Sequence, residues 1–298
     1  MKFNLKYCVL FVFIFFSSTV ANSDVLYFFD YDKFEYIVGE KKAKLLVGYT
    51  KNRKYSDKRS RLTSSFMKKW FGKEQELRYT TVYLLDKDLI RQVDYGKEKI
   101  LETTFSKLTD PDLDSKIKKS RIPEAVEIIN ERYVVKKPVM SVKEISTSGT
   151  VGNYPVKHVQ ITLGMETFDK KKNAISRTEV VMNLYLTSKI EGYDEYNNFI
   201  RHFGKRLGVD SYKFGNLERL SQFLERPLKA AEAKKTEGFP VKTTLVVKGM
   251  YITKPNTSSE KRVERVLQKL TIDLKKVTKG PFDLKLFEPP EKWVVKSN

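Results

Sequence analysis

Hydrophobic and polar positions alternate most regularly between residues 178 and 186. One face of the predicted β-strand is formed by apolar residues at every second position: Val180, Met182, Leu184 and Leu186. In residues 194–207 the apolar side chains recur at helical spacing and form one stripe: Tyr196, Phe199, Ile200, Phe203 and Leu207. Asp194 is placed to cap this helix and Gly208 to end it. The pattern predicts a strand followed at once by an amphipathic helix that can lie across a sheet.

The same alternation predicts strands on both sides of this unit. We expect them at 25–31, 34–38, 44–50, 76–85, 89–95, 100–105, 139–145, 154–163, 240–251 and 262–277. The short turns within 76–105 favour an antiparallel meander. Helices are expected at 59–72, 110–132 and 217–235. No linker divides the chain, so residues 22–298 are predicted to form one domain with a helical insertion near 110–132.

The first residues have the layout of a secretory signal peptide. A short basic start with Lys2 and Lys6 precedes an apolar run at 7–16 and the small residues of 17–21. The run is too short to span a bilayer comfortably, because a span needs about 20 apolar residues. We therefore predict export, with residues 1–21 removed as the signal peptide.

The cysteine content indicates the cellular compartment, and the net charge indicates the class of partner. The single cysteine, Cys8, lies inside the predicted signal, so the mature chain would have no disulfide, which favours a bacterial periplasm or envelope over a eukaryotic secretory route. Loss of Lys2 and Lys6 lowers the net charge from +20 by these two charges to +18. Such an excess indicates either an anionic envelope surface as partner or lysines on solvated faces. Export makes nucleic acid an improbable partner.

No catalytic or metal-binding motif is present in the sequence. The two histidines, His158 and His202, have neither a cysteine partner nor metal-site spacing, which favours structural roles. The acidic triplet at 110–114 lacks the glycine and the glutamate of an EF-hand loop. There is no phosphate loop, nucleophile elbow or zinc-protease helix. We expect no enzyme activity, no cofactor and no metal.

Several segments resemble an exported bacterial family, domain of unknown function 4412. The resemblance is carried by residues 83–95, 102–106, 152–158, 184–196 and 237–243. In 152–158 the glycine and asparagine are exchanged relative to the family and Pro155 is added. Residues 110–132 have no counterpart in the family. Because the family has no assigned catalytic residues, the resemblance assigns none to this chain.

The resemblance implies a fold similar to the lipoprotein-localisation-factor superfamily. That fold is α+β and mainly antiparallel, with a strongly curved, unclosed barrel-like sheet and helices packed on its concave face. It implies a periplasmic, non-catalytic binding protein for a lipid, a lipoprotein or another apolar ligand. The candidate ligand-lining residues are Met182, Leu184, Leu186, Tyr196, Phe199 and Phe203. The alternative is a structural or interaction protein of the cell envelope in which the same side chains form a filled core without a small ligand.

Overall fold

Fourteen of the strands within the described residues form one large sheet. The computed structural model describes residues 24–36, 39–62, 76–108, 128–129, 131–136, 138–206, 234–281, 283–290, 293 and 295–297. The strand order is β16-β6-β5-β4-β3-β2-β1-β15-β14-β13-β12-β8-β7, and β9 also pairs with β12. Neighbours are antiparallel except for β16, which runs parallel to β6. The predicted antiparallel sheet is therefore confirmed.

The first half of the sheet is a meander of consecutive strands. It comprises β1 (Val25–Glu35), β2 (Gly39–Tyr49), β3 (Arg53–Leu62), β4 (Glu76–Leu84), β5 (Leu89–Asp94) and β6 (Lys99–Thr104). Two short helices border it, η1 (Leu85–Lys87) and α3 (Phe105–Leu108). The strands predicted at 76–85, 89–95 and 100–105 are confirmed by β4, β5 and β6.

The second half of the sheet contains the longest strands. It comprises β7 (Ile128–Ile129), β8 (Tyr133–Val135), β9 (Val139–Ser146), β12 (Lys157–Asp169), β13 (Ala174–Thr187), β14 (Phe239–Thr253) and β15 (Lys261–Lys279). A small separate hairpin is formed by β10 (Thr150–Val151) and β11 (Tyr154–Pro155). The C-terminal part adds η3 (Leu284–Phe287) and β16 (Val295–Ser297).

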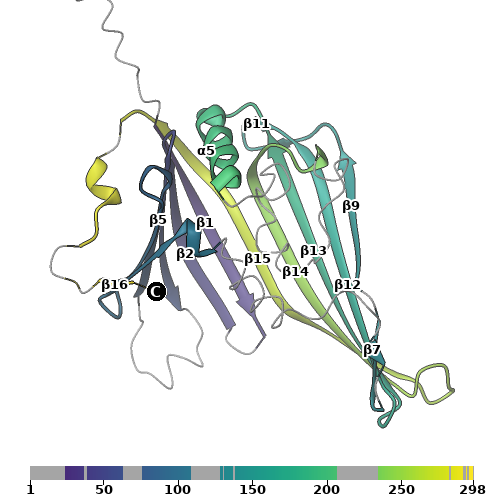
Figure 1. Cartoon of the computed structure of the whole chain (residues 1–298). Coiled ribbons are helices and arrows are strands. Elements are labelled where there is room, and N and C mark those ends of the chain that lie inside the picture. Colours follow the sequence, from purple (N-terminus) through teal and green to yellow (C-terminus); the bar gives the residue numbers. More distant parts are fainter. Residues whose placement is uncertain are drawn as a thin grey trace, which may run out of the picture.

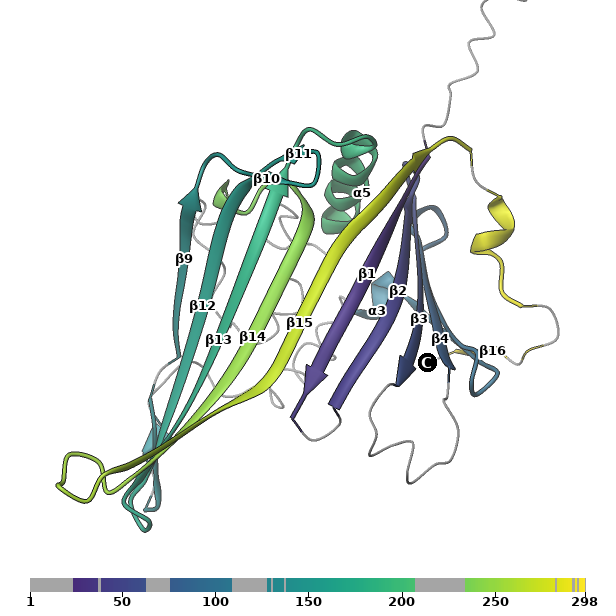
Figure 2. The same cartoon turned by 180° about the vertical axis from the view of Figure 1, so that it is seen from behind.

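Strand β15 joins the two halves. Its residues from Lys261 to Asp273 pair with β14, and its residues from Gln268 to Lys279 pair with β1. In the shared stretch, 268–273, every residue has a strand on both sides. Figures 1 and 2 show β15 crossing from the β12–β14 side to the β1 side.

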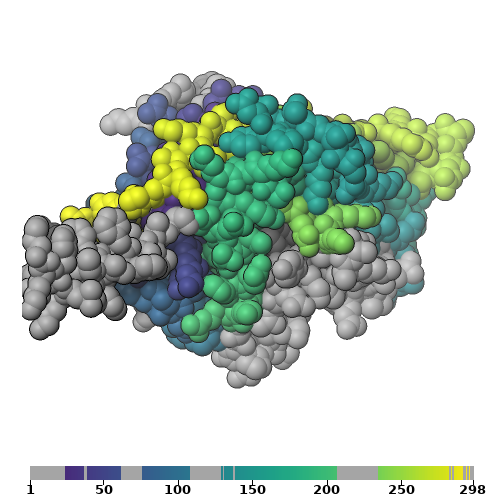
Figure 3. Space-filling view, turned by 90° about the horizontal axis from the view of Figure 1, so that it is seen from above, coloured from purple at the N-terminus to yellow at the C-terminus, as the bar shows by residue number. Residues whose placement is uncertain are grey.

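Helix α5 (Tyr193–Arg206) follows β13 through a short turn, as the sequence pattern predicts. It begins one residue before the predicted cap, so Asp194 lies in its first turn, where a negative charge favours the helix dipole. The helix stands at one end of the sheet (Figure 1). Viewed from above, α5 in green lies between the yellow C-terminal part and the teal strands (Figure 3).

We name the two faces of the sheet by the side chains that alternate along β1 and β2. The helix face carries Tyr27, Tyr49 and Phe239, which contact α5 or one another through their rings. The reverse face carries Phe28 and Leu46, which are cross-strand neighbours. Because alternate residues of a strand point to opposite faces, a run such as 25–29 supplies apolar side chains to both.

The predicted α+β fold, a strongly curved barrel-like sheet with helices on its concave face, is wrong. The sheet is neither closed nor curled (Figures 1 and 2). Closure requires edge strands long enough to pair, whereas β16 and β7, at the two ends of the strand order, have three and two residues. The described residues hold two α-helices, and α3 has only four residues. Helices filling a concave mouth are therefore not shown.

Some of the predicted helices fall partly or wholly outside the described residues. Residues 59–62 of the helix predicted at 59–72 belong to strand β3, and 63–72 lie outside the description. The insertion predicted at 110–132 lies outside up to residue 127, and Ile128–Ile129 form β7 instead of a helix. The predicted signal peptide at 1–21 also lies outside, as does the helix at 217–235 up to residue 233.

Candidate ligand-binding site

The structure divides the six predicted lining residues between two apolar clusters. Tyr196, Phe199 and Phe203 of α5 pack with the aromatic side chains of β1, β2 and β14. The three residues of β13 instead form a cluster with β9 and β12: Met182, Leu184 and Leu186, joined by Val142, Val159 and Ile161. The predicted residues are thus close in sequence but, within the part of the chain that the structure describes, belong to two different clusters.

Ring-to-ring contacts fill the space between α5 and the helix face. The ring of Tyr49 lies 5.4 Å from that of Tyr196 and 5.6 Å from that of Phe199. Phe203 contacts Tyr83 at 5.5 Å between ring centroids. Edge-to-face pairs at such distances are favourable beyond the area they bury. The predicted lining on α5 is therefore a packed core under the helix.

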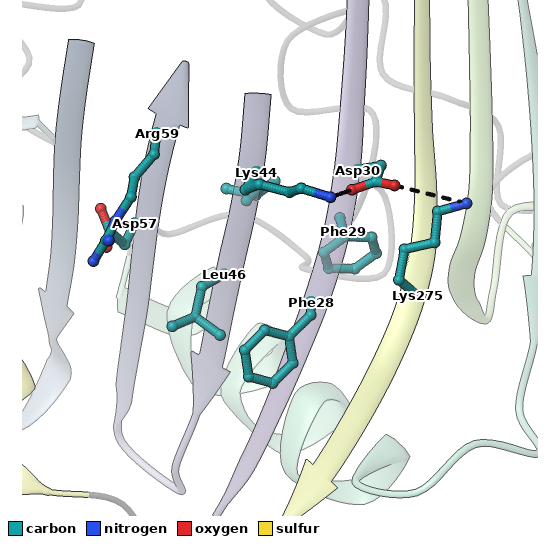
Figure 4. Close-up of a pocket in the computed structure, with 9 residues that line it drawn as sticks. Phe28, Phe29, Asp30, Lys44, Leu46, Asp57, Arg59 and Lys275 are labelled. Carbon is teal, nitrogen blue, oxygen red and sulfur yellow. Dashed lines mark hydrogen bonds and ion pairs between the residues drawn. The ribbon is translucent and has the colours of Figure 1, made fainter. Parts of the chain in front are cut away.

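A pocket of about 430 Å³ opens on the reverse face, between β1, β2, β3 and β15 (Figure 4). Its lining is formed by Phe28, Phe29, Asp30, Lys44, Leu45, Leu46, Asp57, Arg59 and Lys275. Figure 4 shows Phe28 and Leu46 together, with Lys44, Asp30 and Lys275 along the opposite edge, while Asp57 lies on β3 next to Leu46. Its volume lies in the range of small-molecule sites, about 300–1,000 Å³.

The apolar side of this pocket continues into a small core on the reverse face. Leu46 packs against a cluster formed by Tyr55, Val82, Leu84 and Phe287. Phe287 comes from η3, and its ring lies 6.2 Å from that of Tyr55. Burial, and next the neighbouring carboxylate of Asp57, raise the pKa of Tyr55 above its usual 10.0. The phenol is therefore a neutral part of this cluster at ordinary pH.

Two carboxylates of the pocket are each shared between two cations. Asp30 accepts from Lys44 at 2.5 Å and lies 3.9 Å from the ammonium of Lys275 (Figure 4). Asp57 is 4% exposed, and it accepts from Arg59 at 3.2 Å and from Arg78 at 3.0 Å. Outside the lining, the ammonium of Lys276 lies 5.8 Å from the centre of the Phe28 ring. The rim is therefore rich in positive charge.

A β-bulge in β15 brings Lys275 to this pocket and Lys276 beside the Phe28 ring. The register of β1 against β15 shifts between Phe28 and Phe29, so that Phe28 faces Lys276 and Phe29 faces Leu274. Lys275 is the additional residue, and a bulge re-aims such side chains. The sequence contains a signal for it, because the apolar alternation up to Leu274 resumes only at Val277. Neither the bulge nor the pocket was among the features predicted from the sequence.

A second pocket, of about 460 Å³, opens beside the start of α5. Its lining comes from residues 147–149 and 155–157, from the end of β13 and from the residues just before β14. Most of the lining residues have polar side chains, among them Lys157, Thr187, Ser188, Lys189, Tyr193 and Glu237. Leu186 is the one predicted lining residue that reaches it. The hydroxyl of Thr187 is engaged within the chain, since it accepts from the backbone N–H of Lys189 at 3.0 Å. An apolar ligand suits this pocket less well than the first.

The two histidines lie on different elements. The ring of His158, on β12, stacks on Tyr185 at 4.6 Å, and its Nε2 lies 2.9 Å from Oδ1 of Asn183. His202 lies on α5. Within the described ranges, no three acidic, histidine or cysteine side chains are grouped so that they could hold a metal ion.

No family model and no curated protein sequence matches this chain. The resemblance to the exported family therefore stays a prediction. Among the helices that the structure describes, none combines the length and the apolar character needed to cross a membrane.

Proposed function

We propose that the chain is an exported, non-catalytic binding protein for a lipid, a lipoprotein or another ligand with an apolar body. The observation that supports this most is the reverse-face pocket, about 430 Å³ in volume, with Phe28 and Leu46 exposed toward it. Apolar walls with a few well-placed polar groups are typical of ligand sites. Its two carboxylates are held in ion pairs, an arrangement that suits recognition of charge better than proton transfer.

A second candidate is a structural or interaction protein of the envelope with a filled core. It is favoured by the aromatic side chains that occupy the space between α5 and the sheet, where Phe199 is 1% exposed. In this case the pocket on the reverse face would be a surface depression without a physiological ligand. The two candidates differ in whether the purified protein retains a small molecule.

Native mass spectrometry of the gently purified protein separates these candidates. The proposal predicts a mass excess from a bound molecule, which the change Leu46→Asn should reduce because it makes the floor of the pocket polar. The matched control is Val263→Asn, since Val263 is an exposed apolar residue on another part of the sheet. Repeated absence of any added mass in the unaltered protein supports the filled scaffold.

Export is tested separately by sequencing the N-terminus of the mature protein. The signal-peptide pattern predicts a start near Asn22 in the envelope fraction. Recovery of the intact Met1 terminus from the soluble cytoplasmic fraction would contradict export and leave the pocket proposal to be judged on ligand binding alone.

A further inference from the structure

We infer that the reverse-face pocket binds a single-chain amphipathic anion, a hydrocarbon chain that ends in a carboxylate or a phosphate. This inference rests on the proposed function and adds to it the charge and the orientation of the ligand. The anionic group lies at the cationic rim, and the chain lies along Phe28 and Leu46.

Positive charge exceeds negative charge around this pocket. The cations are three lining residues and two that contact lining residues: Lys44, Arg59, Lys275, Arg78 and Lys276. The lining contains two acids, Asp30 and Asp57. Over the lining alone, the three cations exceed the two acids by one positive charge, and Arg78 and Lys276 raise this excess. Asp273, which lies opposite Asp30 in the strand register, is itself paired with Lys242. A ligand anion compensates part of this excess, whereas a ligand cation adds to it.

The lysines of the β15 bulge are the best placed to receive the anion. The ammonium of Lys275 lies 3.9 Å from Asp30, a longer separation than the 2.5 Å between Lys44 and the same carboxylate. Lys275 is also half exposed, so its side chain can turn toward a ligand. The neighbouring Lys276 lies against the Phe28 ring. The bulge therefore supplies two ammonium groups from adjacent residues, Lys275 at the charged edge and Lys276 beside the ring.

The apolar side of the pocket sets the direction of the hydrocarbon chain. In Figure 4 the charged ends of Lys44, Asp30 and Lys275 lie along one edge, while Phe28 and Leu46 lie together away from it. Leu46 continues into the reverse-face cluster that contains Tyr55. A chain with its anionic end at the charged edge would cover both apolar side chains and remove them from water.

Calorimetric titration with three probes of equal chain length tests the inference. The probes are decyl phosphate, decyltrimethylammonium and decyl maltoside, each used as a monomer below its micelle concentration. We expect decyl phosphate to bind one site and the other two to bind at least about tenfold more weakly. Added salt should weaken decyl phosphate binding, because the rim is partly exposed and its charges are screened.

Two variants connect the binding to the named residues. Lys275→Gln combined with Lys276→Gln should weaken decyl phosphate binding by about tenfold, since exposed charge pairs contribute modestly one by one. The matched control, Lys261→Gln, removes a charge from the same strand at its other end and should leave binding unchanged. Phe28→Ala should weaken all three probes together.

The outcomes separate the failure of this inference from the failure of the proposed function. If decyl maltoside binds as tightly as decyl phosphate and the lysine variant does not alter the affinity, the ligand is not an anion, although the pocket still binds apolar chains. If no probe binds and no ligand copurifies, the proposed function itself fails. Binding to phosphatidylglycerol vesicles without binding of monomeric decyl phosphate overturns the pocket and indicates a charged docking face instead.

Discussion

At the scale of single residues, one buried hydroxyl connects the first strand to the turn before α5. Tyr27 has no exposed surface, its ring stacks on Phe239 at 4.2 Å, and its hydroxyl donates to the carbonyl of Glu191 at 2.9 Å. Burial, and next the nearby carboxylate of Glu195, raise the pKa of Tyr27 well above its usual 10.0. The folded state therefore favours the neutral phenol.

This tyrosine predicts a loss of stability in alkaline solution. The folded pKa is raised, so the contribution is fully present below pH 10.0 and is lost as the pH rises from there toward the folded pKa, because only the unfolded chain ionises readily. Urea unfolding at pH 9 and pH 11 should show a larger fall for the unaltered protein than for Tyr27→Phe. The control is Tyr251→Phe, at an exposed tyrosine. An equal fall in all three proteins would contradict the prediction.

The turn between β13 and α5 depends on a glycine for two reasons. Gly192 has φ of 74°, and a Cβ atom added there would lie 2.4 Å from Cγ2 of the buried Val25. We expect Gly192→Ala to destabilise the protein by roughly 2–5 kcal/mol, from left-handed strain and overpacking together. Gly152→Ala is the control, because Gly152 also has a positive φ but faces open space. Gly152→Ala should lower the stability by only about 1–2 kcal/mol. If thermal unfolding shows similar losses of stability for the two variants, the clash with Val25 is excluded.

At the scale of elements, α5 is held by its aromatic stripe. Phe199 is 1% exposed and contacts the rings of Tyr49, Tyr83 and Phe203. Phe199→Ala should cost about 3–5 kcal/mol, the usual range for a buried phenylalanine. The control Asn198→Ala changes the exposed neighbour on the same helix. Equal melting temperatures for the two variants would show that the helix is not docked by this stripe.

The strength of the sequence pattern explains which elements could be predicted. The strict alternation of Met182, Leu184 and Leu186 predicted their burial on one face of β13, and the structure confirms it. The helical spacing of Tyr196 and Phe199 likewise predicted the buried side of α5. These patterns are local, so they need no knowledge of which strands become neighbours.

The curvature of the sheet and the pocket depend on contacts that a local pattern does not contain. Asp30 and Lys275 meet because β1 pairs with β15, from the opposite end of the described chain. Leu45, Leu46 and Val47 are all apolar, so alternation cannot tell which one faces the helix. Whether a sheet curls depends on its strand order and edges, which no local pattern contains. The predicted curvature came only from the resemblance to a known family.

At the scale of the whole molecule, β15 connects the two halves of the large sheet. Residues 268–273 pair with β14 on one side and β1 on the other. Leu270→Pro removes the backbone N–H of residue 270. This N–H points toward either β14 or β1, so in both cases one of these strands loses a hydrogen bond to β15. We expect a loss of at least about 2 kcal/mol and separate unfolding of the two halves.

The control for this prediction is Val263→Pro in the same strand. Val263 pairs with Tyr251 of β14, and β1 does not extend to this part of β15. Denaturant unfolding followed by circular dichroism should remain a single transition in this control. If Leu270→Pro also unfolds in one unchanged transition, β15 is not the joint between the halves.

The position of β15 in the chain has a consequence for the timing of folding. Strand β1 is the first described strand to leave the ribosome, yet β15, one of its two neighbours in the sheet, begins only at Lys261. Until then one edge of β1 has unpaired backbone groups, and the apolar side chains of Leu26 and Phe28 lack their neighbours on β15, which makes this region a surface that chaperones recognise. Such distant pairing makes folding slow, in milliseconds to seconds or longer. In rapid-mixing refolding experiments with hydrogen-exchange labelling, the backbone amides of both halves should therefore become protected from exchange together, when β15 docks between them.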